Sequence, residues 1–304
     1  MRIRVFAVVL VTAFALSGCS QQSSHVIEIQ AGDVVTSRVV ANETPRYSRV
    51  IALANGSAEI IDSLGLKEIL IGRDIASTEP ALKSIPIVTS GHQVVAEKIL
   101  ALNPDLVIID ASVGPTSAIE TLKKSNINVE LINEVWTVDA ISQKVEDLAD
   151  VLGVPATGAA LVKKLESTTD SASQQVEGSP KVLFLYLRGG NSIYLVGGKG
   201  SGADSLFSSI GAIDVGAQNS AKPFASLTAE SLISMNPDVI VVMIKGLESV
   251  GGASGLINLP GVAQTSAGKL SRVIAVDDSL LLSFGTRTPS LLSKLALAFN
   301  EVRR

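Results

Sequence analysis

The sequence has few of the side chains on which enzyme active sites and metal centres usually depend. It contains one cysteine and two histidines among 304 residues. A nucleophile–base pair, or a zinc or manganese site, needs several His, Cys or carboxylate groups that converge. Basic and acidic residues number 25 and 29, without a long basic run, so the charge pattern does not indicate nucleic acid. The composition therefore argues against an enzyme, a dedicated transition-metal site and a nucleic-acid partner.

No apolar run of membrane-spanning length stands at the N-terminus. Residues 5–16 form an apolar run of about a dozen residues, short of the ~20 that span a bilayer. The run follows Arg2 and Arg4 and ends in small residues, which is typical of a secretory signal peptide over residues 1–18. Residues 16–19, Leu-Ser-Gly-Cys, resemble the bacterial lipobox, in which the signal is removed before the cysteine and the sulfur carries a diacylglycerol.

Cys19 has no disulfide partner within the chain, because it is the only cysteine. As the lipidated first residue of the mature protein it predicts an anchor on the extracytoplasmic face of the cell membrane, since acyl chains hold a protein at a bilayer without spanning it. Removal of residues 1–18 takes two arginines from the 25 basic residues, which leaves 23 against 29 acidic residues and a charge near −6. Residues 19–47, with His25 among them, are polar and lack a steady period, which predicts a tether.

The body of the sequence alternates short apolar strands with amphipathic helices, first over residues 48–153 and again over residues 179–304. Such alternation predicts parallel sheets with right-handed crossovers, and hence two α/β lobes. Residues 154–178 between them contain Leu161, Leu165 and few helix breakers, which favours one long helix. Their serine and threonine content also permits a disordered linker. A stiff helix between two lobes predicts a cleft in which a ligand can bind.

One motif occurs twice in the chain. AEKILALNPDLVII covers residues 96–109, and AESLISMNPDVIVV covers residues 229–242. Each copy predicts an amphipathic helix, a stop at Asn-Pro-Asp and a buried strand. Glu97 and Glu230 hold the same place in the first turns of these helices, where a negative charge complements the helix dipole. The repetition indicates two lobes of similar construction.

Several segments together resemble a known family. The lipobox, the strand–turn–helix start NGSAEIIDSLG, the repeated motif and the single connector are similar to substrate-binding lipoproteins of iron-complex and vitamin B12 ABC importers. The resemblance covers essentially all of the mature chain. It implies a class III periplasmic-binding-protein fold, in which two Rossmann-like lobes are bridged by one backbone helix and close little on each other.

Five segments are most similar to the haem-binding members of that family, namely SGHQVVAEKILALNPDLVI, FLYLRG, KGLESVGG, LPGVAQT and FGTRTP. The resemblance implies that the protein captures haem in an interlobe cleft and delivers it to a permease dimer with its ATPase. Haem is then the transported ligand and has no catalytic role. A ferric siderophore or a corrinoid such as vitamin B12 is the alternative ligand of the same importer class.

Two residues are the candidate axial ligands of the haem iron. His92 follows a strand end, where open α/β sheets present ligands, and the resemblance implies that it binds the iron. A lone histidine at such a place is also an ordinary hydrogen-bonding residue. Tyr186 and Arg188 lie on one face at the end of a predicted strand, and a phenolate stabilised by an adjacent cation suits ferric iron. Tyr194 is the fallback ligand.

The haem propionates need anion partners. One candidate is the helix N-terminus at Asn55 and Ser57, whose free N–H groups can bind a carboxylate. The other is Arg287 in FGTRTP, which could equally hold its own lobe together.

The paired glutamates are candidates for permease docking. The resemblance implies that an acidic residue on each lobe meets an arginine pocket on one of the two permease subunits. Glu97 and Glu230 match this scheme, one in each copy of the motif. Complementing the helix dipole is the alternative explanation, and the two roles are compatible.

Overall fold

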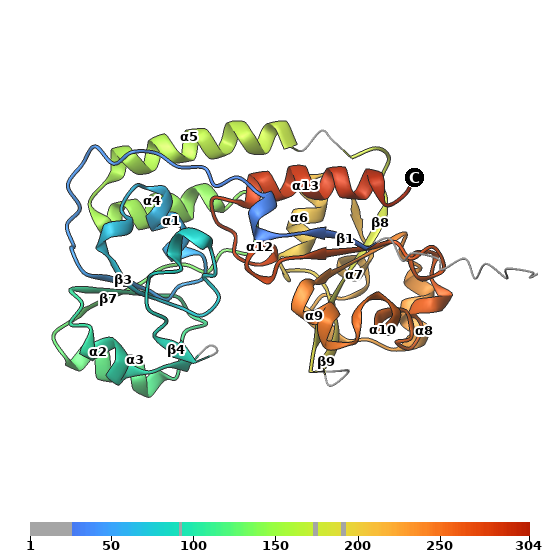
Figure 1. Ribbon diagram of the computed structural model, residues 1–304, viewed down its shortest axis with the longest axis horizontal. Coiled ribbons are helices and arrows are strands. Elements are labelled where there is room, and N and C mark those ends of the chain that lie inside the picture. Colours follow the sequence, from blue (N-terminus) through green and yellow to red (C-terminus); the bar gives the residue numbers. More distant parts are fainter. Residues whose placement is uncertain (1–25, 91–92, 173–175, 190–192) are drawn as a thin grey trace, which may run out of the picture.

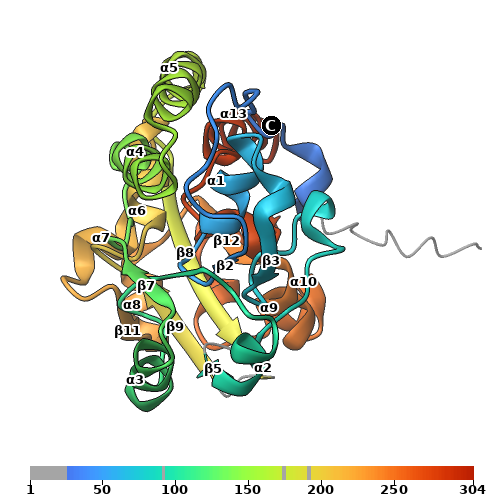
Figure 2. The ribbon, with the colours of Figure 1, turned by 90° about the vertical axis from the view of Figure 1, so that its left-hand side faces the viewer.

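The computed structural model describes residues 26–90, 93–172, 176–189 and 193–304. Two lobes lie side by side, and the long helix α5 (Pro155–Ala172) runs over the first lobe toward α13 (Thr288–Glu301) of the second (Figure 1). Seen from the side of the first lobe, α5 and α13 again lie together at one end of the molecule (Figure 2). Two Rossmann-like lobes joined by one long helix confirm the predicted fold.

The N-terminal lobe is built on a four-stranded parallel sheet in the order β3-β2-β6-β7. Its strands are β2 (Val50–Ala52), β3 (Leu70–Arg73), β6 (Leu106–Ile109) and β7 (Asn128–Leu131). Every residue of β2 and β6 is buried, because these apolar strands are covered by helices on both faces. The strand order reverses between β2 and β6. In open α/β sheets, ligands bind beyond the carboxyl ends of the strands at such a point.

Two pairs of helices cover the N-terminal sheet. One face is covered by α1 (Ser57–Ser63) and α4 (Ile141–Leu152), and the other by α2 (Ala96–Ala101) and α3 (Thr116–Lys124). The connections contain short elements, namely η2 (Lys67–Ile69), η3 (Pro80–Leu82), β4 (Thr89–Ser90) and β5 (Gln93–Val94).

The C-terminal lobe has a seven-stranded sheet in which β1-β13-β12-β8-β9-β11 are neighbours and β10 also pairs with β8. Its strands are β1 (Val26–Ile29), β8 (Lys181–Arg188), β9 (Ile193–Gly197), β10 (Ile213–Asp214), β11 (Phe224–Ser226), β12 (Val239–Met243) and β13 (Val273–Val276). The pairs that involve β9 are antiparallel, and the others are parallel. Its helices, besides α13, are α6 (Ala203–Ser209), α7 (Val215–Asn219), α8 (Ala229–Met235), α9 (Ile244–Ser249), α10 (Gly252–Ile257), η4 (Val262–Gln264), α11 (Ser266–Lys269) and α12 (Asp278–Leu281).

The prediction of a tether up to residue 47 is wrong for residues 26–47. Strand β1 pairs in parallel with β13 and completes the edge of the C-terminal sheet. The chain then passes η1 (Ala31–Asp33) and crosses to the N-terminal lobe, where Arg38 forms an ion pair of 2.6 Å with Asp62. Glu43 accepts hydrogen bonds of 2.8 Å from both N and Oγ1 of Thr157 in α5. A four-residue strand is too short to show a period, so its partner strand could not be anticipated.

Helix α5 packs against both lobes and is not an isolated connector. Leu161 and Leu165 are buried, and the helix contacts both α4 and α13. Eighteen residues correspond to a helix of about 27 Å. Among the described residues, no helix is both long and apolar enough to cross a membrane. The signal peptide, Cys19 and His25 lie outside the described residues.

Candidate ligand-binding cleft

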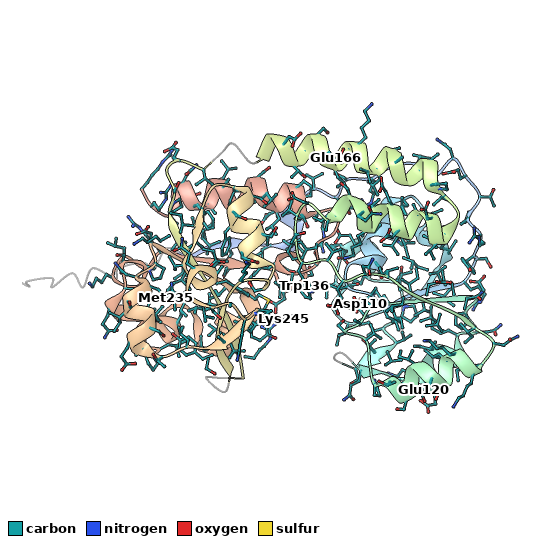
Figure 3. All side chains as sticks on the ribbon, turned by 180° about the vertical axis from the view of Figure 1, so that it is seen from behind. Asp110, Glu120, Trp136, Glu166, Met235 and Lys245 are labelled. Carbon is teal, nitrogen blue, oxygen red and sulfur yellow. The ribbon has the colours of Figure 1, made fainter. Side chains whose placement is uncertain are left out.

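A cavity of about 740 Å³ lies between the lobes and is lined by residues of both. The N-terminal lobe contributes Leu53 and Trp136, and the C-terminal lobe contributes Tyr186, Phe224 and Met243. Such a large cavity with mainly apolar walls and a few polar groups is typical of a site for a small organic ligand or cofactor. Figure 3 shows Trp136 and Lys245 in the region where the two lobes meet.

Tyr186 lies on the cleft face of β8. Its ring makes an edge contact with Phe224, with centroids 5.4 Å apart, and it is half-buried. Among the described residues, the phenolic oxygen of Tyr186 has no hydrogen-bond partner, although the side chain lines the cavity. A phenolic oxygen placed in this way is free to meet a ligand.

Arg188 lies beside Tyr186, as the strand alternation predicts, but contacts it differently. The guanidinium carbon is 5.1 Å from the centre of the Tyr186 ring, which is a cation–π contact. Its Nη2 donates a hydrogen bond of 2.6 Å to Asp278. Stabilisation of a Tyr186 phenolate by this cation would involve a hydrogen bond from Arg188 to the phenolic oxygen; in the structure, Asp278 and the face of the Tyr186 ring hold the guanidinium instead.

Tyr194 does not line the cleft, so the structure contradicts its role as fallback ligand. In the antiparallel pair of β8 and β9, Tyr186 lies opposite Leu195, and Leu187 lies opposite Tyr194. Side chains alternate between faces along a strand, so Tyr194 occupies the face away from the cavity. Its hydroxyl approaches the carbonyl of Pro260 at 3.4 Å, and burial raises its pKa to about 12.

The N-terminal wall includes Asn55 but not Ser57. Asn55 follows β2 and lines the cavity; its backbone N–H donates to Asp110 at 2.8 Å, and its side-chain amide donates to the carbonyl of Leu282 at 2.7 Å. Ser57 is fully buried, and its hydroxyl donates to the carbonyl of Ala54 at 2.6 Å. The expectation that Ser57 contacts the ligand is therefore wrong, since its backbone N–H also donates to the carbonyl of Ala54, at 3.0 Å, and neither group is left for a ligand.

His92 lies outside the described residues. The short strands β4 and β5 flank this position, and Thr89 of β4 lines the cavity. The role of His92 as an axial ligand stays a prediction.

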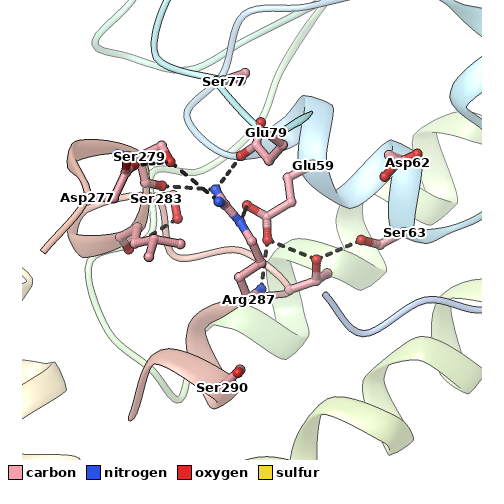
Figure 4. Close-up of polar contacts among 12 residues, drawn as sticks. Glu59, Asp62, Ser63, Ser77, Glu79, Asp277, Ser279, Ser283, Arg287 and Ser290 are labelled. Atoms are coloured by element: carbon pink, nitrogen blue, oxygen red, sulfur yellow. Dashed lines mark hydrogen bonds and ion pairs between the residues drawn. The ribbon is translucent and has the colours of Figure 1, made fainter. Parts of the chain in front are cut away.

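Arg287 does not face the ligand cavity, which corrects the expectation that it binds a propionate. Its side chain is 2% exposed. Its Nε donates to Glu59 at 2.9 Å, and its Nη2 forms an ion pair with Glu79 (Figure 4). Nη1 and Nη2 also approach the hydroxyl and the carbonyl of Ser279. A buried guanidinium needs partners for its donors, and the two glutamates already supply them.

This buried network connects the lobes, and no pattern in the sequence indicates it. Glu59 and Glu79 belong to the N-terminal lobe, whereas Arg287 belongs to the C-terminal lobe. Burial, together with the charge of Glu59, raises the pKa of Glu79 to about 8, although Arg287 acts in the opposite direction. Oxygen Oε2 of Glu79 is buried and has no hydrogen-bond partner among the described residues. Protonation of Glu79 lowers the free-energy cost of burying this oxygen, because the carboxyl group is then neutral.

Lys144 adds a second polar link between the lobes. Its ammonium group donates to the carbonyls of Ser283 and Phe284, each at 3.3 Å, in the segment between α12 and α13. Burial lowers the pKa of Lys144 to about 8, while Glu59 and Asp110 oppose this shift. The segment that carries Arg287 is thus held against the N-terminal lobe, which fixes the base of the cleft.

Glu97 and Glu230 occupy corresponding places in the two lobes. Each lies in the first turn of its helix, α2 or α8, and each is exposed. Both helices lie on the half of the molecule away from α5 (Figures 1 and 2). The structure thus leaves both carboxylates accessible.

The comparisons with known proteins agree with this architecture. The sequence pattern of the periplasmic binding protein family matches residues 50–280, which is most of the chain. The chain belongs to this family. The periplasmic haem-binding protein RhuT from Roseiflexus sp. RS-1, solved in apo form, is 35% identical with a TM-score of 0.81, over 85% of this chain and 100% of that one.

Other relatives include an uncharacterised lipoprotein and a protein named for vitamin B12. YvrC of Bacillus subtilis, an uncharacterised ABC transporter substrate-binding lipoprotein, is 24% identical over 97% of this chain and 96% of its own length. The vitamin B12-binding protein of Vibrio campbellii is 26% identical over 63% of this chain and 69% of its own length. The protein is therefore an extracytoplasmic substrate-binding protein of an ABC transporter, in the group that takes haem, vitamin B12 or siderophores, and it is not an enzyme.

Proposed function

We propose that this periplasmic binding protein captures ferric haem in the interlobe cleft and delivers it to an ABC importer. Tyr186 supplies an axial ligand from the C-terminal lobe, and His92 supplies the other from the N-terminal lobe. The observation that carries the proposal is Tyr186 at the cavity wall: its phenolic oxygen has no hydrogen-bond partner among the described residues, and the cation of Arg188 lies over its ring. A phenolate is a suitable ligand for ferric haem iron, and the adjacent cation stabilises it.

The walls of the cavity also suit a flat aromatic macrocycle. Trp136 and Phe224 add aromatic surface to the lining, and Leu53, Leu195 and Met243 add apolar surface. A ferric catecholate siderophore carries negative charge around its metal and would need several cations. Vitamin B12 carries its own axial ligands on cobalt and needs no protein phenolate. Haem therefore fits the cleft better than either alternative.

Trp136 provides a direct test of ligand choice, because it is the chain's only tryptophan and it lines the cavity. Titration of the mature protein with hemin, cyanocobalamin and a ferric catecholate should quench its fluorescence at the lowest concentration with hemin. We expect the affinity for hemin to exceed the other two by at least about tenfold, or about 1.4 kcal/mol. If cyanocobalamin or the siderophore bound more tightly than hemin, haem would not be the ligand.

The lipobox-like sequence predicts that Cys19 anchors the protein. Replacing Cys19 with serine should release the protein from the membrane fraction, because no acyl chain can then be attached, while hemin binding stays unchanged. Fractionation in high salt followed by immunoblotting measures this. A Cys19→Ser protein that stays with the membrane would show that another feature anchors it.

The paired glutamates predict a two-point dock on the permease. The double change Glu97→Ala and Glu230→Ala should abolish haem-dependent growth through the importer but leave the Kd for hemin within a few-fold, because both carboxylates are exposed and neither lines the cavity. Glu120→Ala together with Glu248→Ala is a matched control, since these exposed residues are also one in each lobe. Normal uptake by the Glu97/Glu230 variant would leave these residues only their effect on the helix dipoles.

A further inference from the structure

The charges in the cleft are distributed unequally between the lobes. The described residues that line the cavity include two cations, Arg188 and Lys245, and both come from the C-terminal lobe. The facing N-terminal wall carries the carboxyl groups of Asp74 and Glu79. A ligand that bears carboxylates of its own should therefore turn them toward the C-terminal lobe.

The two cations are not equally available to a ligand. Arg188 is already engaged: its Nη2 donates to Asp278 at 2.6 Å, its Nη1 donates to the carbonyl of Leu187 at 3.2 Å, and its guanidinium carbon lies 5.1 Å from the centre of the Tyr186 ring. Asp278 offsets much of the charge of Arg188. Its other oxygen accepts the backbone N–H of Lys245 at 3.0 Å, which fixes the start of α9 at the cleft.

The side chain of Lys245 is exposed, and its ammonium group has no partner among the described residues. The residue nevertheless lines the cavity, at the edge of the C-terminal lobe that faces the N-terminal lobe (Figure 3). In the described part of the cleft, Lys245 is thus the cation that can pair with a ligand without breaking an existing ion pair.

In its described part, the N-terminal wall offers no comparable attraction for an anion. Both oxygens of Asp74 accept hydrogen bonds, from the hydroxyl of Ser77 and from the backbone N–H of Ala76, and burial raises its pKa. Glu79 is paired with Arg287. The carboxyl groups of Asp74 and Glu79 are either negatively charged or neutral. In neither form do they attract a carboxylate of the ligand as strongly as a free ammonium group does.

We propose that Lys245 is the specificity-determining residue that pairs with the carboxylate edge of the ligand, and that it orients haem with its propionates toward α9. This inference rests on the proposed function, because it assumes that haem enters the cleft. Pairing with Lys245 also distinguishes haem from corrinoids, because the peripheral side chains of corrinoids are mainly amides, which carry no charge. A charge-assisted hydrogen bond to Lys245 therefore favours haem over vitamin B12.

The test compares hemin with hemin dimethyl ester, in which both propionates are capped and neutral. The wild-type mature protein should bind hemin roughly 10-fold more tightly than the ester, as one charge-assisted contact predicts. Lys245→Gln should weaken hemin binding by about the same factor and leave the ester unaffected, so that the preference disappears. Lys245→Arg should retain the preference, because it keeps the charge.

Lys269→Gln is the matched control, since Lys269 is an exposed lysine of the same lobe that does not line the cavity. It removes the same charge and should leave both affinities at the wild-type values. Equal effects of Lys245→Gln and Lys269→Gln, or equal loss of hemin and ester binding, would overturn the role of Lys245. If neither hemin nor its ester bound the wild-type protein, the proposed haem function itself would fail, which is a distinguishable result.

Discussion

Replacing Tyr186 with phenylalanine should weaken hemin binding by roughly 100-fold, or about 3 kcal/mol. The substitution removes only the phenolic oxygen, while the ring that contacts Phe224 and Arg188 stays in place. The loss therefore reports the bond between the oxygen and the iron rather than a loss of packing. Quenching of Trp136 fluorescence by hemin gives the Kd of each variant.

Tyr194→Phe is the matched control, because Tyr194 lies on the opposite face of the same sheet. It should bind hemin like the wild type. His92→Ala should alter the Soret region, and the double variant of His92 and Tyr186 should bind far more weakly than either single variant. If Tyr194→Phe lost hemin binding and Tyr186→Phe kept it, the assignment of the ligand to the cleft face of β8 would be wrong.

Replacing Arg287 with alanine should lower the free energy of unfolding by about 3–5 kcal/mol. The change leaves Glu59 and Glu79 buried without their shared cation, and it removes ion pairs that connect the two lobes. Urea unfolding followed by circular dichroism measures the loss. The hemin affinity of the folded fraction should change little, because Arg287 does not line the cavity.

Arg38→Ala is the control for this prediction. Arg38 also pairs with a carboxylate of the N-terminal lobe, Asp62, but its side chain is 49% exposed. Surface ion pairs of this kind contribute about 1 kcal/mol or less. Similar losses for Arg38→Ala and Arg287→Ala would show that the buried network does not hold the lobes together.

The fold could be predicted because its information is local and repeated. The motif copies over residues 96–109 and 229–242 each contain a helix, a stop and an apolar strand, and the structure forms these elements in both lobes. The long helix was predictable from its spacing of leucines. Strand β1 was not, because four residues carry no period and the partner, β13, lies more than 240 residues further along the chain.

The site was predicted only where one strand determined it. Tyr186 and Arg188 lie on one face of β8, as alternation requires, and both line the cavity. The position of Tyr194 depends on how β9 pairs with β8, and that of Arg287 depends on Glu59 and Glu79, which lie 228 and 208 residues away in the sequence. Such distant partners leave no signal in a single sequence. The place of Lys245 could not be predicted either, since only the fold brings it to the cleft.

The absorption spectrum of the purified mature protein, recorded as hemin is added at micromolar concentration, tests the central claim most directly. Capture of ferric haem through Tyr186 predicts a saturable change in the Soret band together with a phenolate-to-iron charge-transfer band, and Tyr186→Phe should lose the latter. A wild-type protein that leaves the spectrum of free hemin unchanged would contradict haem as the ligand.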